Sequence, residues 1–319
     1  MTKLTKNFSF SFRPEAPYNF ELTVRKPAGW DLFTPFEIYE YGILWTALHL
    51  DDTLLGLKLR SHGTTDSPKI VVTAFLKKAP DFEEKRLFRE MLASKLGVDH
   101  DLAEFYAMAG RDGILRHTVE DLYGMNDTQP SSIFGAAVLA ICLQMAPLKR
   151  SNEMMACIIR KNGELAEFDG KEVRVWPLPR TISALQVDDF AEECKLGYRA
   201  RLIMKLANTL VKENFPSVEK LARLSPEVAK QKLMELPGIG DYSADIINPH
   251  AGFPIDAWSV DVFSKLFYGR EPKNGRDAIE TVKAEGVRRW GKWSWMAFFY
   301  VAQDLENLSR KLGTLLRLV

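Results

Sequence analysis

The spacing of apolar residues divides the chain into two regions. Up to about residue 80, apolar and polar residues alternate, as at Phe8, Phe10 and Phe12, and a period of two is typical of half-buried strands. The same alternation predicts further strands over residues 20–24, 43–50, 54–59 and 70–76. We therefore expect residues 1–80 to form one antiparallel sheet domain with an open face.

From about residue 81 the apolar residues follow helical spacing. The predicted helices cover residues 82–96, 102–109, 114–122 and 131–145, and helical signals resume from 187 to 319 after a turn-rich interval at 163–180. The helix over 131–145 is nearly uncharged, which predicts a central, buried position. The predicted fold class is α+β, with a small antiparallel sheet followed by a two-part helical body over 81–319.

Composition is that of an ordinary globular protein. The 319 residues are 46% hydrophobic and 27% charged, and the net charge is +1. No apolar run approaches the ~18 residues that span a membrane, and the first residues lack an apolar signal core. We expect no membrane partner and a location in the cytoplasm, at the nucleoid, or in a nucleus. Three cysteines make neither a disulfide framework nor a four-thiolate site.

One motif carries chemical information. Ser225-Pro226 is a strong helix start, and the helix it begins is followed by Leu236-Pro237-Gly238-Ile239-Gly240 and by a second helix from Asp241 that ends before Pro249. Glycines in such a hairpin allow positive φ and let backbone N–H groups approach a phosphate. The pattern predicts a helix-hairpin-helix, a DNA-binding element; the alternative is a plain tight turn.

The hairpin resembles that of the helix-hairpin-helix, Gly/Pro-Asp superfamily of DNA glycosylases. Those enzymes place an essential aspartate about twenty residues beyond the hairpin, and Asp261 lies 21 residues beyond Gly240. The segment Ser259 to Phe263 is similar to the one that carries the aspartate in 8-oxoguanine glycosylases. The resemblance therefore implies Asp261 as the catalytic residue. Asp256, which follows Pro254-Ile255, is the rival, and we expect Asp245 to be structural.

Further segments extend the resemblance over most of the chain, from about residue 8 to 306. Gly197 to Ala200 and Trp290-Gly291 with Asp304-Leu305 are similar to segments of 8-oxoguanine glycosylases, and a sheet domain is typical of that branch and of 3-methyladenine glycosylase II. The resemblance also implies a DNA-contacting edge where the long apolar helix ends. The predicted DNA-binding residues are Gly238, Ile239, Gly240, Gln144, Met145, Arg150 and Arg199.

Met145 is the candidate wedge that fills the gap left by a flipped base. It follows the long apolar helix and comes just before Pro147, which should break that helix and leave the preceding side chains at an edge of the protein. A flexible apolar side chain suits insertion between base steps. The alternative is that Met145 is an ordinary core residue at a helix end.

The chain departs from the superfamily pattern at one reactive position. Members with lyase activity carry a nucleophilic lysine two residues after the second hairpin glycine, where this chain has Tyr242. A tyrosine cannot form a Schiff base, so we predict no β-lyase step. No cysteine follows Cys194, which excludes a C-terminal iron–sulfur cluster, and the histidines show no zinc spacing. The one cofactor left open is a monovalent cation on the hairpin carbonyls.

An aromatic stretch supplies candidate walls for a base pocket. The predicted pocket residues are Tyr242, Trp293, Trp295, Phe298 and Phe299. Rings suit a flipped base because they stack on it, and they attract it further when the base is cationic, as an N-alkylated purine is. Rings at helical spacing are, however, more often core residues, so we expect only some of them to reach a pocket.

The predicted function is base excision repair by a monofunctional DNA glycosylase that acts on duplex DNA as a monomer. Such an enzyme flips the damaged base out of the stack, and a carboxylate stabilises the oxocarbenium-like charge on the sugar. An alkylated purine of the 3-methyladenine type is the first candidate substrate. The alternatives are oxidised or deaminated bases, including 8-oxoguanine, hypoxanthine and uracil, or a non-catalytic DNA-binding protein.

Overall fold

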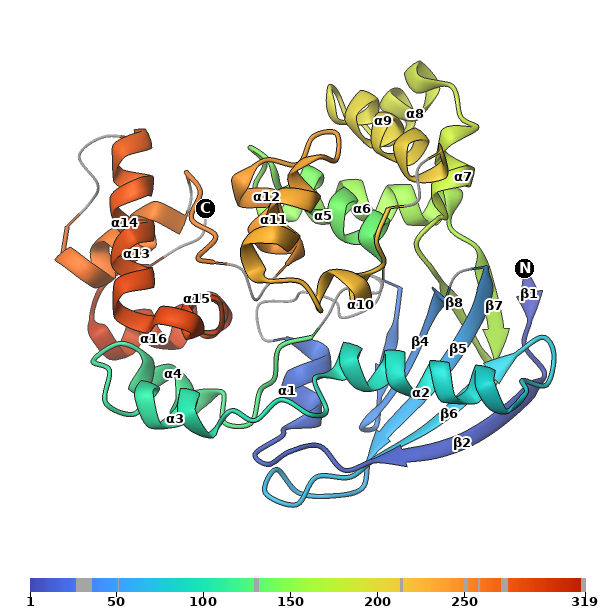
Figure 1. Cartoon of the computed structure of the whole chain (residues 1–319), viewed down its shortest axis with the longest axis horizontal. Coiled ribbons are helices and arrows are strands. Elements are labelled where there is room, and N and C mark those ends of the chain that lie inside the picture. Colours follow the sequence, from blue (N-terminus) through green and yellow to red (C-terminus); the bar gives the residue numbers. More distant parts are fainter. Residues whose placement is uncertain are drawn as a thin grey trace.

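The protein has a sheet domain joined to a helical body (Figure 1). The computed structural model describes residues 1–26, 36–50, 52–128, 132–212, 215–248, 252–257, 259–270 and 275–316. A five-stranded antiparallel sheet has the order β2-β6-β5-β4-β3. Its strands are β2 (Lys6–Phe12), β3 (Ile38–Glu40), β4 (Ile43–Leu50), β5 (Thr53–Ser61) and β6 (Ile70–Leu76). The predicted α+β class and four of the predicted strands are confirmed.

Both faces of this sheet are covered, so the expectation of an open face is wrong. Helix α2 (Phe82–Leu96), which begins with a capping box between Asp81 and Glu84, packs its apolar side on one face. The other face meets a small sheet of order β1-β7-β8. A side chain on Gly56 would lie 2.6 Å from the Phe168 ring, so glycine permits this close approach. These short strands are β1 (Thr2–Lys3), β7 (Leu165–Phe168) and β8 (Lys171–Arg174).

The strand predicted over residues 20–24 is instead a helix, α1 (Phe20–Arg25). Asn19 caps it, because its side-chain oxygen accepts a 3.1 Å hydrogen bond from the Leu22 backbone N–H. Phe20, Thr23 and Val24 are its buried residues, which is helical spacing. Over so short a segment the alternation of Phe20, Leu22 and Val24 does not separate a strand from a helix.

The helical body has two cores, which fits its prediction as a two-part body. Helices from 133 to 247 surround one core, while the second combines α3 and α4 with the last helices of the chain, far away in sequence but adjacent in Figure 1. Helix α5 (Ile133–Leu143), capped by Ser132, is almost entirely buried in the first core, as predicted. The helices beyond it in that core are α6 (Leu148–Asn162), α7 (Pro179–Ser183), α8 (Val187–Glu193), α9 (Arg199–Lys212), α10 (Val218–Leu221), α11 (Pro226–Met234) and α12 (Asp241–Ile247).

The second core includes residues from the C-terminal helices of the described chain. Its helices are α3 (Ala103–Ala109), α4 (Leu115–Asp121), α13 (Ser259–Tyr268), α14 (Gly275–Trp290), α15 (Ser294–Gln303) and α16 (Leu305–Leu312), with a 3-10 turn at Gly291–Trp293. Phe253, Phe263 and Trp290 pack ring against ring within it. Within the described residues, no helix has the length and apolar character needed to cross a membrane.

Candidate active site

The predicted helix-hairpin-helix is present, formed by α11, the hairpin at 236–240 and α12. Ser225 caps α11 through its Oγ, with Pro226 at the first helical position. Gly238 has a φ of +81°, which glycine adopts without strain. A Cβ there would lie 3.3 Å from Ile141 and Leu202, so glycine also allows the hairpin to pack closely against these side chains. Gly240 has an extended backbone and is exposed, and a Cβ there would meet no atom within 4 Å, whereas the Ile239 side chain is buried in the core.

Gln144 connects the end of α5 to this hairpin. Its Nε2 donates hydrogen bonds to the Gly238 carbonyl at 2.7 Å and to the Ser243 hydroxyl at 3.1 Å. The Arg199 guanidinium donates to the carbonyls of Gln144 and Ile141. The predicted DNA-contacting segments around 144, 199 and 238 are therefore held together by side chains. Gln144 and Arg199 thus hold the backbone of the hairpin and of the end of α5 in position.

Met145 is the exposed member of this group. Its side chain is 76% exposed and its φ is +49°, which places it on a tight turn between α5 and α6. The alternative that Met145 is a core residue is excluded by this exposure. An apolar side chain held out from the protein at this edge has the geometry that a wedge requires.

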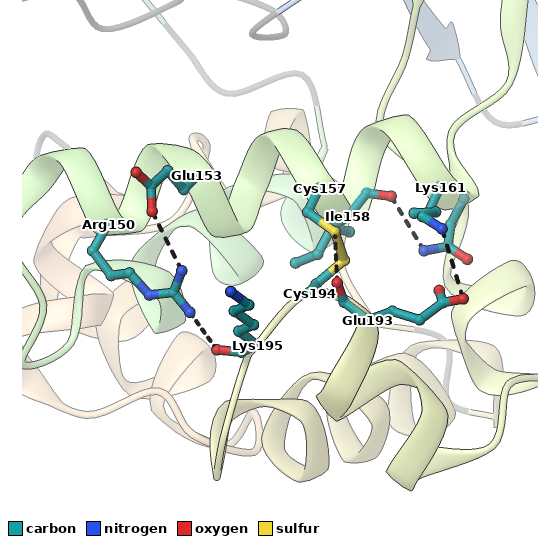
Figure 2. The surroundings of a disulfide bond; sticks show 9 residues. Arg150, Glu153, Cys157, Ile158, Lys161, Glu193, Cys194 and Lys195 are labelled. Atoms are coloured by element: carbon teal, nitrogen blue, oxygen red, sulfur yellow. Dashed lines mark hydrogen bonds and ion pairs between the residues drawn. A yellow bond between two sulfur atoms is a disulfide. The ribbon is translucent and has the colours of Figure 1, made fainter.

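Arg150 lies near a disulfide that the sequence did not lead us to expect (Figure 2). Cys157 of α6 is bonded to Cys194, which ends α8. One Arg150 nitrogen donates to the Lys195 carbonyl at 2.5 Å, and another lies 3.4 Å from a Glu153 carboxylate oxygen. The disulfide and the hydrogen bond from Arg150 to Lys195 both join α6 to the segment before Arg199, so Arg150 has a structural role beside its predicted DNA contact.

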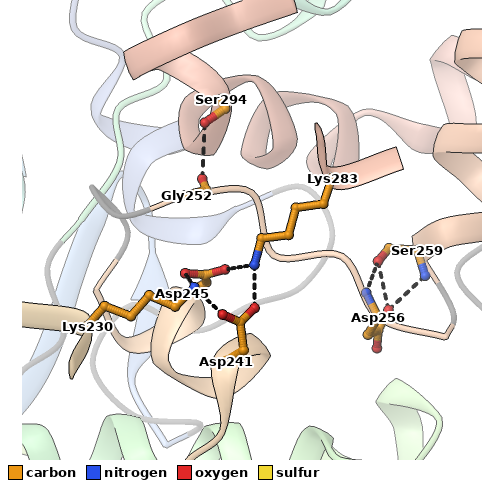
Figure 3. Close-up of polar contacts among 8 residues, drawn as sticks. All are labelled: Lys230, Asp241, Asp245, Gly252, Asp256, Ser259, Lys283 and Ser294. Atoms are coloured by element: carbon orange, nitrogen blue, oxygen red, sulfur yellow. Dashed lines mark hydrogen bonds and ion pairs between the residues drawn. The ribbon is translucent and has the colours of Figure 1, made fainter. Parts of the chain in front are cut away.

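Two lysines and two aspartates join the hairpin's second helix to α11 and α14 (Figure 3). Asp245 is fully buried, and its two oxygens lie 2.7 Å from Lys230 Nζ and 2.8 Å from Lys283 Nζ. The same two lysines also bind Asp241. Burial raises the pKa of Asp245, which the two ammonium groups oppose. Asp245 thus has the structural role that was expected of it.

Asp256, which precedes α13, and Asp261, which lies within it, occupy different environments. Asp256 caps the helix: its Oδ1 accepts hydrogen bonds from the Ser259 N–H at 2.8 Å and the Ser259 hydroxyl at 2.7 Å (Figure 3). Asp261 lies in the first turn, with its side chain 37% exposed and its Oδ2 accepting a 2.8 Å hydrogen bond from Lys265 Nζ. Ser259 therefore holds the Asp256 carboxylate at the start of the helix, whereas the Asp261 carboxylate forms an ion pair with Lys265 on the helix surface.

The environment of Tyr242 combines burial with a nearby negative charge. Burial and the negative charge of Asp256 both raise the pKa of the Tyr242 phenol, so these two groups lie within electrostatic reach of each other. Tyr242 is in the first turn of α12, directly after the hairpin. The structure therefore brings together the hairpin, the aromatic residue that replaces a lysine, and the carboxylate that we ranked second from sequence spacing.

The four rings predicted on 293–299 separate into core and partly accessible positions. Phe298 is buried between Phe253 and Phe263, and Trp293 packs on Phe105. Trp295 remains half-buried and lies nearly parallel to Phe299, with ring centroids 6.4 Å apart. Trp293 is half-buried as well, whereas Phe299, like Phe298, is a buried residue of the second core, so Trp293 and Trp295 are the better candidates for a pocket wall.

Several residues of this region were missed from the sequence. The Trp295 Nε1 donates a 2.8 Å hydrogen bond to Asp127, and Lys26 lies over the Phe299 ring at 5.1 Å from its centroid. Nothing in the local sequence marks either residue, because both come from segments far from α15. The helix cap formed by Asp256 and Ser259 could have been predicted, because the two residues have the three-residue spacing of a capping pair.

The chain thus combines an antiparallel sheet with a helical body that carries a helix-hairpin-helix. The helix-hairpin-helix is an element suited to binding a DNA phosphate. No protein-family model matches the chain. A DNA-3-methyladenine glycosylase of Bacillus subtilis (strain 168) is 24% identical over 209 residues, which are 64% of this chain and 67% of that protein.

Two solved structures cover nearly the whole chain. A 3-methyladenine DNA glycosylase from Archaeoglobus fulgidus has a TM-score of 0.74 at 21% identity, covering 96% of this chain and 100% of that one. The apo form of Clostridium acetobutylicum 8-oxoguanine glycosylase/lyase has a TM-score of 0.70 at 18% identity, covering 94% and 97%. The resemblance inferred from the hairpin is confirmed: the chain has the fold of the helix-hairpin-helix DNA glycosylases.

Proposed function

We propose that this protein is a DNA glycosylase of base excision repair, which flips a damaged base out of a duplex and hydrolyses its N-glycosidic bond. The observation that carries this proposal is the Asp256 carboxylate, which Ser259 holds at the start of α13, within electrostatic reach of Tyr242 directly after the hairpin. The similarity to a 3-methyladenine glycosylase and to an 8-oxoguanine glycosylase/lyase supports the same class of reaction.

In this proposal Asp256 is the first candidate for the catalytic carboxylate. Departure of the base leaves positive charge on the deoxyribose, and a fixed carboxylate beside that sugar stabilises the charge and accepts a proton from the attacking water. Ser259 holds Asp256 through two hydrogen bonds to the same oxygen, Oδ1. Asp261, the first choice from spacing, is already paired with Lys265 and is kept as the alternative.

The DNA contacts follow from the exposed parts of the site. The Gly240 backbone faces open space at the start of α12 and suits a phosphate beside the lesion. Met145 is exposed at the same edge and suits insertion into the gap that a flipped base leaves. The partner is therefore a duplex with a damaged base, bound by one copy of the chain.

Tyr242 in place of a lysine supports base release without strand cleavage, because a phenol cannot form an imine with the sugar. The first candidate substrate is an alkylated purine of the 3-methyladenine type. The similarity to an 8-oxoguanine glycosylase/lyase supports an oxidised base as the second candidate.

A panel of duplexes tests the proposal, each with one alkylated, oxidised or deaminated base. We expect release of at least one of these bases under single-turnover conditions, with an alkali-labile abasic site left behind. Duplex binding without base release from any member of the panel would instead indicate a non-catalytic DNA-binding protein.

A further inference from the structure

Lys283 joins the two parts of the helical body beside the hairpin (Figure 3). It lies on α14, a helix of the second core, and its Nζ donates a 2.8 Å hydrogen bond to Asp245 on α12, a helix of the first core. The same ammonium group also binds Asp241, in the first turn of α12. Asp245 is fully buried, so its ion pair with Lys283 is screened much less than a surface pair and ties the two helices together.

The segment that leads to the candidate catalytic carboxylate passes against this ion pair. Gly252 has a φ of +117°, and a Cβ there would lie 3.0 Å from Asp245 Oδ1, so the backbone at residue 252 packs directly on the buried carboxylate. Phe253 is fully buried, and a Cβ on Gly286 of α14 would lie 2.4 Å from its ring. The Ser294 hydroxyl of α15 donates a 3.2 Å hydrogen bond to the Gly252 carbonyl. The segment is thus held between α12, α14 and α15.

This packing sets the spacing between the hairpin and Asp256. Tyr242 lies in the first turn of α12, directly after the hairpin, and is within electrostatic reach of Asp256. Lys283 ties α12 to α14, and Phe253, three residues before Asp256, rests on α14. A shift of α12 relative to α14 would therefore move the hairpin and Tyr242 relative to the carboxylate. The ion pair of Lys283 resists that shift, because it spans the two helices.

We infer that Lys283 is a positioning residue, which holds the Asp256 carboxylate at the distance from the hairpin that base release requires. This inference rests on the proposed glycosylase function, with Asp256 as its carboxylate. Lys283 acts through Asp245 and through the packing of residues 252–256. Because a misplacement of about 1 Å costs a reaction on the order of 10²-fold in rate, Lys283 should control the rate of base release and not the affinity for DNA.

The test replaces both partners of the ion pair, since removing one alone would leave a buried charge without its partner. In Lys283→Met/Asp245→Asn the cluster stays electrically balanced, because Lys230 still pairs with Asp241 at 2.6 Å. Single-turnover base release should fall by about 10- to 100-fold, while the affinity for an abasic-site duplex and the urea midpoint stay close to those of the unmodified protein. Lys283→Arg keeps the charge and should keep most of the rate.

Lys232→Met is the matched control. Lys232 lies on α11, the other helix that borders the hairpin, and its Nζ is 3.0 Å from a carboxylate oxygen of Glu235. This pair lies at the end of one helix and is largely exposed, so it ties no second helix to α11. Lys232→Met should leave both the rate of base release and the affinity for DNA unchanged.

A double-mutant cycle separates positioning from general damage to the fold, and it uses the milder variant Lys283→Gln, which keeps a hydrogen-bond donor. Lys283→Gln should slow base release in the unmodified protein, but by less than about threefold in an Asp256→Asn background, where no carboxylate is left to position.

Three results would overturn the inference: an unchanged rate in Lys283→Met/Asp245→Asn, equal losses of rate and of DNA affinity in that variant, or the full loss from Lys283→Gln in the Asp256→Asn background. If the unmodified protein releases no base from any duplex of the panel, the proposed function fails first. If the unmodified protein is active and Asp256→Asn keeps its full rate, the choice of carboxylate is wrong and the inference fails with it.

Discussion

The Gln144 amide donates a 2.7 Å hydrogen bond to the Gly238 carbonyl, so the turn that presents Met145 is attached directly to the hairpin. Gln144→Leu would leave that carbonyl and the Ser243 hydroxyl without this donor, at a cost of about 1–2 kcal/mol in unfolding free energy. We expect weaker binding of damaged and undamaged duplexes alike, measured by fluorescence anisotropy beside urea unfolding. Gln186→Leu, at an exposed position without a side-chain capping bond, is the control and should change neither quantity.

Asp256→Asn should reduce single-turnover base release by about 10²–10⁴-fold while binding to abasic-site DNA survives. Asparagine keeps an oxygen that can accept the Ser259 hydrogen bonds and is a good helix cap, so the helix start should be retained. Asp261→Asn removes a carboxylate paired with Lys265 and should leave most activity. The opposite ranking of the two variants would return the catalytic role to Asp261.

The choice between these aspartates shows how far sequence spacing reaches. The helices on either side of the hairpin followed from Ser225, Pro226 and the glycines, because local capping and turn chemistry determine them. The spacing between the hairpin and the candidate catalytic carboxylate depends instead on the length of a connecting segment, which local rules do not constrain, so the choice between Asp261 and Asp256 stays a prediction. Lys26 and Asp127 were beyond prediction for a related reason, since only tertiary packing brings them to α15.

The misassigned elements have an equally local cause. In α1 the alternation of Phe20, Leu22 and Val24 satisfied the strand pattern, and the capping role of Asn19 was overlooked. Strands β7 and β8 have four residues each, too few for a period of two to stand out in a turn-rich interval. Because those two strands were not predicted, the face of the large sheet that they cover was expected to be open.

Because position 242 is a tyrosine and not a lysine, we expect no covalent intermediate between protein and DNA. Borohydride added during turnover should trap no protein–DNA adduct, because no amine occupies this position beside Asp256. The measurement is a denaturing gel of labelled duplex, with a known lyase as positive control. Trapping that persists in Tyr242→Phe would mean that a lysine elsewhere is the nucleophile and that lyase activity is present.

Asp304 predicts a dependence of stability on pH. It is 2% exposed, and burial together with the neighbouring Asp121 raises its pKa to about 7. The folded state therefore keeps a proton that the unfolded chain releases near pH 4, so this carboxyl lowers stability as pH rises from about 4 to 7. Asp304→Asn should stabilise the protein by about 1–3 kcal/mol at pH 8 and by less at pH 5, measured by urea unfolding. An equal effect at both pH values would contradict this.

The exposed position of Met145 leads us to expect that base excision from some substrates, but not others, depends on the turn between α5 and α6. Because its side chain is 76% exposed, Met145→Ala removes almost no buried area and should leave the melting temperature unchanged. If Met145 fills the space of the flipped base, the variant should slow excision from fully paired duplexes by about tenfold, while single strands and lesions opposite a gap react at the original rate. Only paired duplexes bear the full cost of unstacking, which is what separates a wedge from a general DNA contact. Met91→Ala in α2 is the control for loss of a methionine away from the DNA-facing edge. Unchanged excision from paired duplexes by a stable Met145→Ala protein would rule out the wedge.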